Sequence, residues 1–443
     1  MFTFVYLTEV AIKKFASHRA RVGVLGLGYA GLPLACCFAE AGFASVGFDI
    51  DAAKIAQLAQ GRSYIEHIPH ARVAALTSSA TLLATSDFTE LSGCDAAIIC
   101  VPTPLSESKE PELTAIVRAA SEIARRLHPG QLVVLESTSY PGTTEEVMLP
   151  ILARSGLEVG KDFFLAFASE RENPGSPDYP TAQIPKIVGG VTANCLEVAS
   201  STYAQIIKRI VPVSSSRVAE ASKLIENVYR CVNVATINEL KLMFDKMGID
   251  VWEVIAAGST KPFGFTPFYP GPGVGGLCIP IDPVYLGWKA RQHNFPARFI
   301  ELAGEINASM PSYVVDRLAV GLESQDKRLK DASVLLIGVS YKRDIDDIRE
   351  SPAIYIIELL QRRMAQVGYH DPHVLRLRLP RSNRELSSMD LSAAAVASAD
   401  AVVIVTDHRS IDYELIVEHG RLIVDTRNVT AHLRKPGDKI ITV

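Results

Sequence analysis

Cys278 is the residue whose type and surroundings best suit covalent chemistry. It lies in the segment GVGGLCIPID, residues 273–282, where glycines precede the thiol and Asp282 follows it by four residues. Glycines let a backbone approach a bound ligand closely, and a thiolate readily attacks a carbonyl carbon. A lone cysteine is more often a buried structural residue, but these neighbours favour a functional thiol. The other six cysteines lie in apolar or helical runs and are interpreted as structural.

Three polar residues elsewhere could assist such a nucleophile. Lys223 and Asn227 are four residues apart in a predicted helix, so their side chains share one face. A lysine and an amide on one face can stabilise an alkoxide or oxyanion, although spacing alone also fits a solvated lysine and a surface asparagine. Glu170 ends a predicted strand, at an edge of a sheet where ligands bind. Its alternative interpretation is a solvated charge run.

Gly26, Gly28 and Gly31 form a GxGxxG motif between a short apolar strand and a helix. The first glycine allows a tight turn, the second a close approach to a pyrophosphate, and the third close packing of helix on strand. Asp49 ends the next strand, where a carboxylate can accept the ribose hydroxyls of NAD and repel the extra phosphate of NADP. A glycine-rich turn without a nucleotide is the alternative. The motif predicts NAD, and a thiol in an NAD protein suggests an aldehyde oxidised through a hemithioacetal and a thioester.

The pattern of predicted strands and helices that position these residues indicates an α/β fold. Short apolar strands alternate with helical stretches through the first 212 residues, as expected for a doubly wound and mostly parallel sheet. The predicted strands are RVGVLG (21–26), SVGFDID (45–51), AAIICVPTP (96–104), QLVVLEST (131–138), FFLAFASE (163–170) and PKIVGG (185–190).

The alternation of predicted strands and helices stops after residue 212. Residues 216–248 are predicted to form one long helix that could pack against another subunit, and more helix is expected up to about residue 325. A second alternating pattern begins at SVLLIGVSYK (333–342), but its Gly338 lacks the later glycines that would admit a pyrophosphate. The prediction is two Rossmann-like doubly wound domains, 1–212 and 326–443, joined by a central long-helix region, 213–325.

Bulk composition excludes several classes of protein. The formal charge of −4 over 443 residues gives no basic footprint for nucleic acid. Seven scattered cysteines without a CxxC pair favour neither a disulfide framework nor a zinc site. The first 20 residues do not have the order of a secretory signal, and no apolar run is long enough to span a bilayer. The sequence therefore predicts a cytoplasmic protein without a metal or membrane partner.

Seven motifs, in order, resemble the UDP-glucose/GDP-mannose (nucleotide-sugar) 6-dehydrogenase family. They are VGVLGLGYAGLPLA, VPTPL, ESTSYPGTT, ASERENPG, ASKLIENVYR, FYPGPGVGGLCIPIDP and GVSYKRDIDDIRESP, and they cover nearly the whole chain. The resemblance implies an NAD-dependent oxidation of the C6 hydroxyl of a UDP-sugar to a carboxylate, in two steps and through a cysteine thioester. It also implies a dimer or higher oligomer of identical subunits, assembled through the central helices.

The resemblance also implies residue roles. Cys278 would be the nucleophile, Lys223 and Asn227 would hold the developing negative oxygen, and Asp282 would assist water and proton transfers. Glu170 would aid thioester hydrolysis, and Thr138 would position a water. The implied NAD contacts are Gly26, Gly28, Gly31, Asp49, Thr103 and Arg349. The implied UDP-sugar contacts are Tyr341, Lys342, Arg427 and, reaching the substrate of a neighbouring subunit, Lys261.

Within the family, the stretches KPFGFTPFYPGPG and IDPVYLGWKAR resemble the branch that acts on UDP-N-acetylhexosamines, chiefly the UDP-N-acetylglucosamine 6-dehydrogenases of bacterial polysaccharide pathways. Ile281 differs from the lysine common before the acid in UDP-glucose enzymes, and Leu277 departs from the histidine usual before the cysteine in the N-acetyl branch. UDP-glucose, UDP-N-acetylmannosamine and UDP-N-acetylgalactosamine remain alternative substrates. A binding protein without turnover and a single-step 3-hydroxyacid dehydrogenase are alternatives of other classes, and neither needs the thiol.

Overall fold

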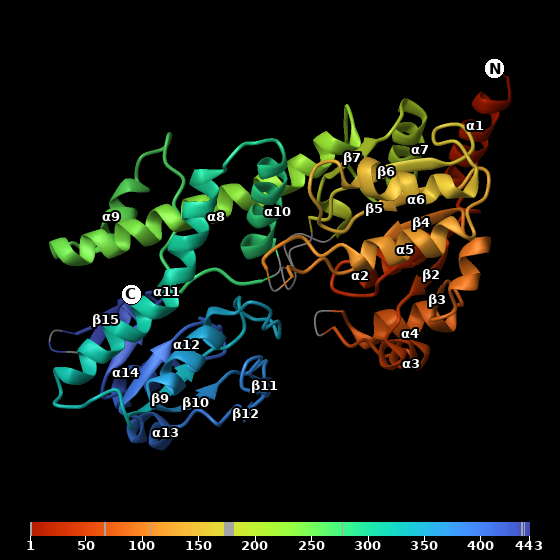
Figure 1. The fold of residues 1–443 in the computed structure, drawn as a ribbon. Helices are drawn as coiled ribbons and strands as arrows, with labels where there is room; N and C mark the ends of the chain where they lie inside the picture. Colours follow the sequence, from red (N-terminus) through yellow and green to blue (C-terminus); the bar gives the residue numbers. More distant parts are fainter. Residues whose placement is uncertain are drawn as a thin grey trace. The chain divides into compact units, whose positions relative to one another are not determined.

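A computed structural model describes residues 2–65, 68–106, 108–171, 181–276, 278–435, 437 and 439–443 of the chain. Contacts divide it into two compact units. Unit 1 contains Met1–Glu226 and Val284–Phe295, and unit 2 contains Asn227–Pro283 and Pro296–Val443. Each unit contains one large sheet (Figure 1).

The sheet of unit 1 has eight strands in the order β3-β2-β1-β4-β5-β6-β7-β8. Every neighbouring pair is parallel except β6 and β7, which are antiparallel. The strands are β1 (Arg21–Leu25), β2 (Ala44–Phe48), β3 (Leu82–Thr85), β4 (Ala96–Ile99), β5 (Leu132–Leu135), β6 (Phe164–Ala168), β7 (Lys186–Gly190) and β8 (Ile210–Val213). This arrangement confirms the predicted doubly wound, mostly parallel sheet.

Helices cover both faces of this sheet (Figure 1) and bury two apolar clusters against it. The helices are α1 (Phe2–Ala16), α2 (Gly31–Glu40), α3 (Ala52–Ala59), α4 (His70–Ser78), α5 (Thr114–Ala124), α6 (Leu149–Leu152) and α7 (Ala193–Tyr203). Shorter helical turns are η1 (Phe88–Gly93), η2 (Thr143–Met148), η3 (Ala153–Ser155) and η4 (Thr181–Gln183). The N-terminal helix α1 packs against α7 and buries Phe15.

The predicted long helix is confirmed as α8 (Ser216–Met247), and Gly248 ends it with a φ of 70°. Residues of α8 up to Glu226 belong to unit 1, and those from Asn227 onward belong to unit 2. The helices after it are α9 (Val251–Gly258), α10 (Cys278–Gln292), α11 (Arg298–Glu323), α12 (Pro352–Arg362), α13 (Ala393–Ser398), α14 (Tyr413–His419) and the turn η5 (Ala431–Leu433).

The sheet of unit 2 has five parallel strands in the order β10-β9-β13-β14-β15. Beside it, β11 and β12 form a short antiparallel pair. The strands are β9 (Ser333–Ile337), β10 (Gln366–His370), β11 (Arg376–Arg378), β12 (Glu385–Ser387), β13 (Ala401–Ile404), β14 (Ile423–Asp425) and β15 (Ile440–Thr442). The second predicted α/β domain is thereby confirmed. The three-part division at residues 212 and 325 stays a prediction.

The strand order reverses once in each sheet, between β1 and β4 in unit 1 and between β9 and β13 in unit 2. Ligands of open α/β sheets bind beyond the carboxyl ends of the strands at such a point. The segments that follow β1, β4, β9 and β13 are therefore the places to look for a site. Across the described part of the chain, none of the helices combines the length and apolar character needed to cross a membrane.

Candidate active site

The loop after β1 has the form that a dinucleotide requires. Gly26 has a φ of 93°, and a Cβ there would lie 2.7 Å from the carbonyl oxygen of Cys100. A Cβ on Gly31 would lie 1.8 Å from the carbonyl oxygen of Gly26, so only glycine permits this packing of α2 on β1. A Cβ on Gly28 would meet no protein atom within 4 Å. The backbone at Gly28 is thus open to an approaching pyrophosphate, as expected for the second glycine.

Asp49 follows β2 and is buried beside this loop. One carboxylate oxygen accepts a hydrogen bond from the Leu27 backbone N–H at 2.9 Å and lies 3.2 Å from Nζ of Lys54. The other accepts the backbone N–H of Asp51 at 3.0 Å. These contacts fix the carboxylate at the position from which it would accept ribose hydroxyls. The loop and the acid together fit NAD.

Thr103 and Thr138 lie in the loops after β4 and β5, at the same edge of the sheet. Thr103 is buried, and its carbonyl oxygen accepts a hydrogen bond from the Tyr285 hydroxyl at 3.2 Å. Thr138 is half-buried. Next to it, the Ser137 hydroxyl donates to the carbonyl oxygen of Val101 at 2.8 Å and thereby ties the two loops together. Unit 1 therefore gathers Thr103, Thr138 and the glycine loop on one edge.

Lys223 and Glu170 are brought together in unit 1. Nζ of the buried Lys223 lies 3.1 Å from the Glu170 carboxylate and also donates to the Glu170 carbonyl oxygen. Glu170 follows β6, which ends at Ala168, two residues earlier than predicted. The pair places a positive charge and a carboxylate in one buried spot. Glu170 is therefore not part of a solvated charge run.

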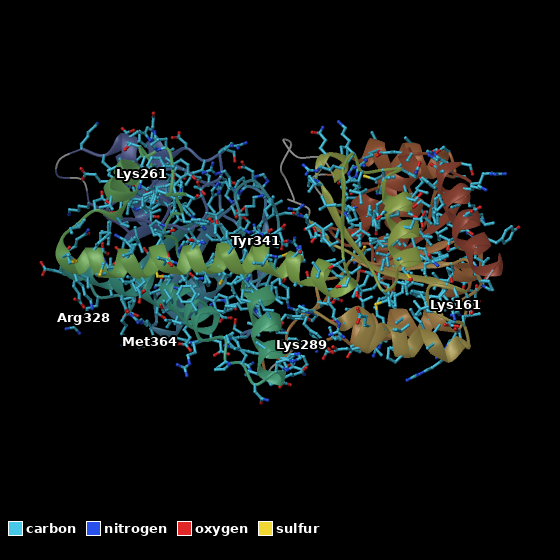
Figure 2. All side chains as sticks on the ribbon, turned by 90° about the horizontal axis from the view of Figure 1, so that it is seen from above. Lys161, Lys261, Lys289, Arg328, Tyr341 and Met364 are labelled. Carbon is cyan, nitrogen blue, oxygen red and sulfur yellow. The ribbon has the colours of Figure 1, made fainter. Side chains whose placement is uncertain are left out.

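Glu220 links the start of α8 to the turn after β5 through hydrogen bonds. It was not among the site residues predicted from the sequence. Its buried carboxylate accepts hydrogen bonds from the backbone N–H groups of Gly142 at 2.5 Å and Thr144 at 2.8 Å, and from the Thr144 hydroxyl at 2.7 Å. On the same turn, Glu146 lies 2.6 Å from Nζ of Lys289, a residue labelled in Figure 2. Because Glu220 precedes Lys223 by one helical turn, it fixes the position of that lysine relative to the Thr138 loop.

In unit 2, Asn227 donates a hydrogen bond to the Asp282 carboxylate, and both side chains are buried. Arg230 in turn donates to the Asn227 side-chain oxygen. Arg230 was not predicted as a site residue, although it lies one turn after Asn227 in the motif ASKLIENVYR. The half-buried Cys278 begins α10, four residues before Asp282, so the thiol and this hydrogen-bonded group share one face of the helix.

The glycine-rich loop before Cys278 packs on the loop that follows β9. The backbone N–H of Gly276 donates to the Arg349 carbonyl oxygen at 2.9 Å, and a Cβ on Gly276 would lie 2.9 Å from the Tyr341 ring. Burial raises the pKa of Tyr341 to about 12, and the negative charges of Asp347 and Cys278 add to this rise. Two predicted motifs thus meet, with Tyr341 beside the thiol.

Two cations predicted to contact UDP adjoin this region. Arg427 donates through Nε to the Val405 carbonyl oxygen at 2.8 Å, and a Cβ on Gly271 would lie 3.1 Å from its Nη1. Burial lowers the pKa of Arg427 to about 10. The pKa of Lys342 is also lowered, first by burial and then by the positive charge of Arg230. Unit 2 therefore collects positive charge around the glycine-rich loop.

Two predicted site residues remain to be placed, Lys261 and Arg349. Lys261 is exposed in the segment after α9, with Nζ 4.8 Å from the centre of the Phe263 ring. Figure 2 shows Lys261 and Tyr341 well separated within unit 2, so Lys261 does not join the UDP residues of its own unit. The Arg349 side chain is paired with Asp347 at 2.6 Å. Leu277 lies outside the described residues.

Comparison with known proteins gives the family. Three models of the UDP-glucose/GDP-mannose dehydrogenase family match the chain: the NAD binding domain at residues 20–207, the central domain at 217–309 and the UDP binding domain at 335–432. The chain belongs to this family. The protein is an NAD-dependent oxidoreductase with a UDP binding domain, which confirms the predicted family and cofactor.

Individual relatives differ in the sugar that their names state. The chain is 39% identical to a UDP-N-acetyl-D-glucosamine 6-dehydrogenase of Pseudomonas aeruginosa, over 80% of this chain and 83% of the relative. It is 36% identical to an NDP-N-acetyl-D-galactosaminuronic acid dehydrogenase of Ralstonia nicotianae, over 92% and 96%. The solved structure of a UDP-D-ManNAc dehydrogenase from Pyrococcus horikoshii matches with a TM-score of 0.84 and 34% identity, over 96% and 99%.

Asp49→Asn is expected to weaken discrimination between NAD and NADP. The amide keeps an oxygen for the Leu27 N–H but loses the charge that repels a 2′-phosphate, while Lys54 remains to attract it. We expect the KM for NAD to rise roughly tenfold to a hundredfold, the range for a charge-assisted hydrogen bond, and the KM for NADP to fall. Steady-state kinetics with both cofactors measure this. Asp51→Asn, the same change on the neighbouring N-cap of α3, is the control, and equal effects of the two variants would contradict the assignment.

Glu220 is expected to make the stability of the dehydrogenase depend on pH. Burial raises the pKa of Glu220 from 4.5 to about 7, against the opposing effect of its three donors. Because the folded state holds this proton more tightly, the contribution to the free energy of unfolding is present below pH 4.5 and is lost as pH rises towards 7. The loss amounts to about 3 kcal/mol. Urea unfolding at several pH values should show this slope in the wild type and not in Glu220→Gln, whereas Glu145→Gln on the same turn should retain it.

Proposed function

We propose that the protein oxidises the C6 hydroxyl of UDP-N-acetylglucosamine to the uronic acid, in two steps through a Cys278 thioester, for bacterial polysaccharide synthesis. The observation that carries the proposal is the half-buried Cys278 at the start of α10, one helical turn before the Asp282 that accepts a hydrogen bond from Asn227, and close enough to Tyr341 to raise its pKa. A family member that only bound its ligands would have no use for a thiol there. The name of the Pseudomonas aeruginosa relative supports the choice of sugar.

The residues divide the chemistry as follows. The Cys278 thiolate adds to the C6 aldehyde, and the partial positive charge at the N-terminus of α10 stabilises this anion. Lys223 and Asn227, both N–H donors, stabilise the alkoxide of the resulting hemithioacetal. Bound NAD supplies the hydride acceptor. Loss of hydride from the hemithioacetal leaves a thioester at the sulfur.

Hydrolysis of the thioester then regenerates the thiol. Thr138 orients the water, and Glu170 or Asp282 takes its proton as the C–S bond breaks. Lys223 lies 3.1 Å from the Glu170 carboxylate and holds it in place for this role. One alcohol, two NAD and one water thus give one carboxylate, two NADH and three protons. We assign Arg349 to the cofactor, and Tyr341, Lys342 and Arg427 to the UDP portion.

We further propose that the protein acts as a homodimer or larger assembly through α8. The exposed large apolar side chains of this helix include two pairs spaced by four residues: Ile225 with Tyr229, and Met243 with Met247. An apolar face of this kind is typical of a subunit contact. Lys261, exposed and apart from the UDP residues of its own unit, is then free to reach a second subunit. Light scattering of the purified protein measures the mass that tests this.

NADH formed per sugar consumed tests the proposed reaction. Two NADH per UDP-N-acetylglucosamine are expected, with a lower kcat/KM for UDP-glucose and for the N-acetylmannosamine and N-acetylgalactosamine sugars. One NADH per sugar would exclude the thioester route. UDP-N-acetylmannosamine is the second candidate, because the Pyrococcus horikoshii structure named for that sugar superposes with a TM-score of 0.84. A higher kcat/KM for it would retain the mechanism and change the substrate.

A further inference from the structure

The two sheets begin in the same way. Each first strand ends in a glycine with positive φ, Gly26 after β1 at 93° and Gly338 after β9 at 78°. Each neighbouring strand, β2 and β10, is followed by an aspartate that accepts the next backbone N–H of that turn, Asp49 from Leu27 at 2.9 Å and Asp371 from Val339 at 2.6 Å. Asp371 therefore occupies the position of a ribose-binding acid.

Asp371 cannot serve that purpose, because its carboxylate is fully buried and its oxygens are already used. One oxygen accepts from the Val339 N–H, from the Ser340 N–H at 3.1 Å and from Nε2 of His408 at 3.1 Å. The other accepts the backbone N–H groups of His373 at 2.8 Å and Val374 at 3.0 Å. A carboxylate offers about four lone-pair sites, so these five donors saturate it.

His408 continues this network to the far end of the loop. It is fully buried, and with Nε2 donating to Asp371, its Nδ1 is left to accept the backbone N–H of Asp344 at 3.0 Å. Asp344 has a φ of 60°, a left-handed conformation that costs free energy in a residue other than glycine. Both ring nitrogens are engaged, so neither offers a lone pair to a metal ion although His373 lies close by.

The loop Gly338–Asp344 is thus fixed at both ends. Asp371 holds Val339 and Ser340, His408 holds Asp344, and Tyr341 and Lys342 lie between these anchors. Burial would by itself raise the pKa of Asp371, but His408 and the backbone donors outweigh it and hold the value at about 2. The aspartate is therefore ionised throughout the working range of pH.

We propose that His408 and Asp371 are positioning residues for UDP recognition, which hold the Gly338–Asp344 loop so that Tyr341 and Lys342 meet the nucleotide. In this second sheet, Asp371 stands where an acid would bind ribose in a dinucleotide site, but it holds the loop in place instead. The inference rests on the proposed roles of Tyr341 and Lys342. It adds two residues that do not themselves touch the ligand.

The test compares His408→Ala, His408→Gln and His408→Asn. Alanine removes the hydrogen bonds to Asp371 and to the Asp344 N–H, glutamine keeps a donor for Asp371, and asparagine keeps an acceptor for the Asp344 N–H. Isothermal titration with UDP is expected to show a Kd raised about tenfold or more in the alanine variant, with partial recovery in one or both amides. The Kd for NAD and the kcat at saturating substrate should stay close to the wild-type values. His419→Ala, at a half-exposed histidine of α14 in the same unit, is the control.

An unchanged UDP affinity in His408→Ala would overturn the proposal, as would equal losses of UDP and NAD affinity, which indicate general unfolding. Where the alanine variant does not fold, the glutamine and asparagine variants provide the same comparison. If the wild type binds no UDP at all, the proposed role of Tyr341 and Lys342 fails as well. If the wild type binds UDP and the His408 variants bind it equally well, only the positioning role of His408 and Asp371 is rejected.

Discussion

Cys278→Ser is expected to abolish formation of the uronic acid, with a fall in kcat on the order of 10³-fold or more. A serine hydroxyl at this position remains protonated at neutral pH and adds poorly to an aldehyde, so neither the hemithioacetal nor the thioester forms. The first oxidation removes hydride from an alcohol and does not require the thiol. The variant should therefore release at most one NADH per sugar, in a single-turnover experiment that follows absorbance and product together.

Cys37→Ser is the matched control, because Cys37 is also half-buried but lies in α2, where we assign no chemistry to its thiol. It should retain two NADH per sugar. A Cys278→Ser variant that still makes two NADH per sugar at the wild-type rate would reject covalent catalysis. The 3-hydroxyacid dehydrogenase interpretation predicts a third outcome: one NADH per substrate in the wild type, at a rate that the loss of Cys278 leaves unchanged, since a single hydride transfer has no thioester.

The sequence predicts best those features that are local in the chain. The turn after β1 needs three glycines within six residues, and Asp49 stands at the end of the very next strand. Both were visible as a pattern because one βαβ unit contains every part of it. Strands β3 and β8 were missed for the opposite reason. Each has only four residues, and β8 contains Pro212, a residue that an edge strand tolerates but that is depleted in strands generally.

The residues missed in the candidate site are those whose roles depend on distant partners. Glu220 is one more charge on a long helix until its contact with Gly142, 78 residues earlier, is known. Arg230 is recognised as a site residue only from its hydrogen bond to the Asn227 side chain and from its effect on the pKa of Lys342. Asp371 and His408 are 37 residues apart, in the segments that follow β10 and β13. No periodicity encodes such pairs, because they are fixed by how strands line up in the folded sheet.

Burial also separates residues that sequence patterns leave equivalent. Spacing alone favoured a solvated lysine at position 223 and allowed a solvated glutamate at 170, yet their side chains are only 6% and 16% exposed and face each other. Two charges withdrawn from water cost several kcal/mol unless they are paired. Such a pair is retained at an active site where one partner must stay charged. This raises the expectation that Lys223 acts on the reacting oxygen.

Lys223→Met is accordingly expected to lower kcat by about 10²–10³-fold, the loss found when one donor to a developing oxyanion is removed. The KM values for NAD and for the UDP-sugar should change little, because the interaction strengthens only as the alkoxide forms. Lys246→Met, at an exposed lysine in the last turn of the same helix, should behave as the wild type. A fall below tenfold in Lys223→Met would leave the lysine only a structural partner of Glu170.

Pairing with Glu170→Gln separates the two roles of this lysine. If Lys223 both stabilises the alkoxide and holds the Glu170 carboxylate in place, the double variant should cost little more than the worse single variant. Residues that act as a unit give such non-additive losses, since removing one already disables the other. Fully additive losses would show that Lys223 and Glu170 act on separate steps, and the 3.1 Å contact between them would then serve only to place two independent groups.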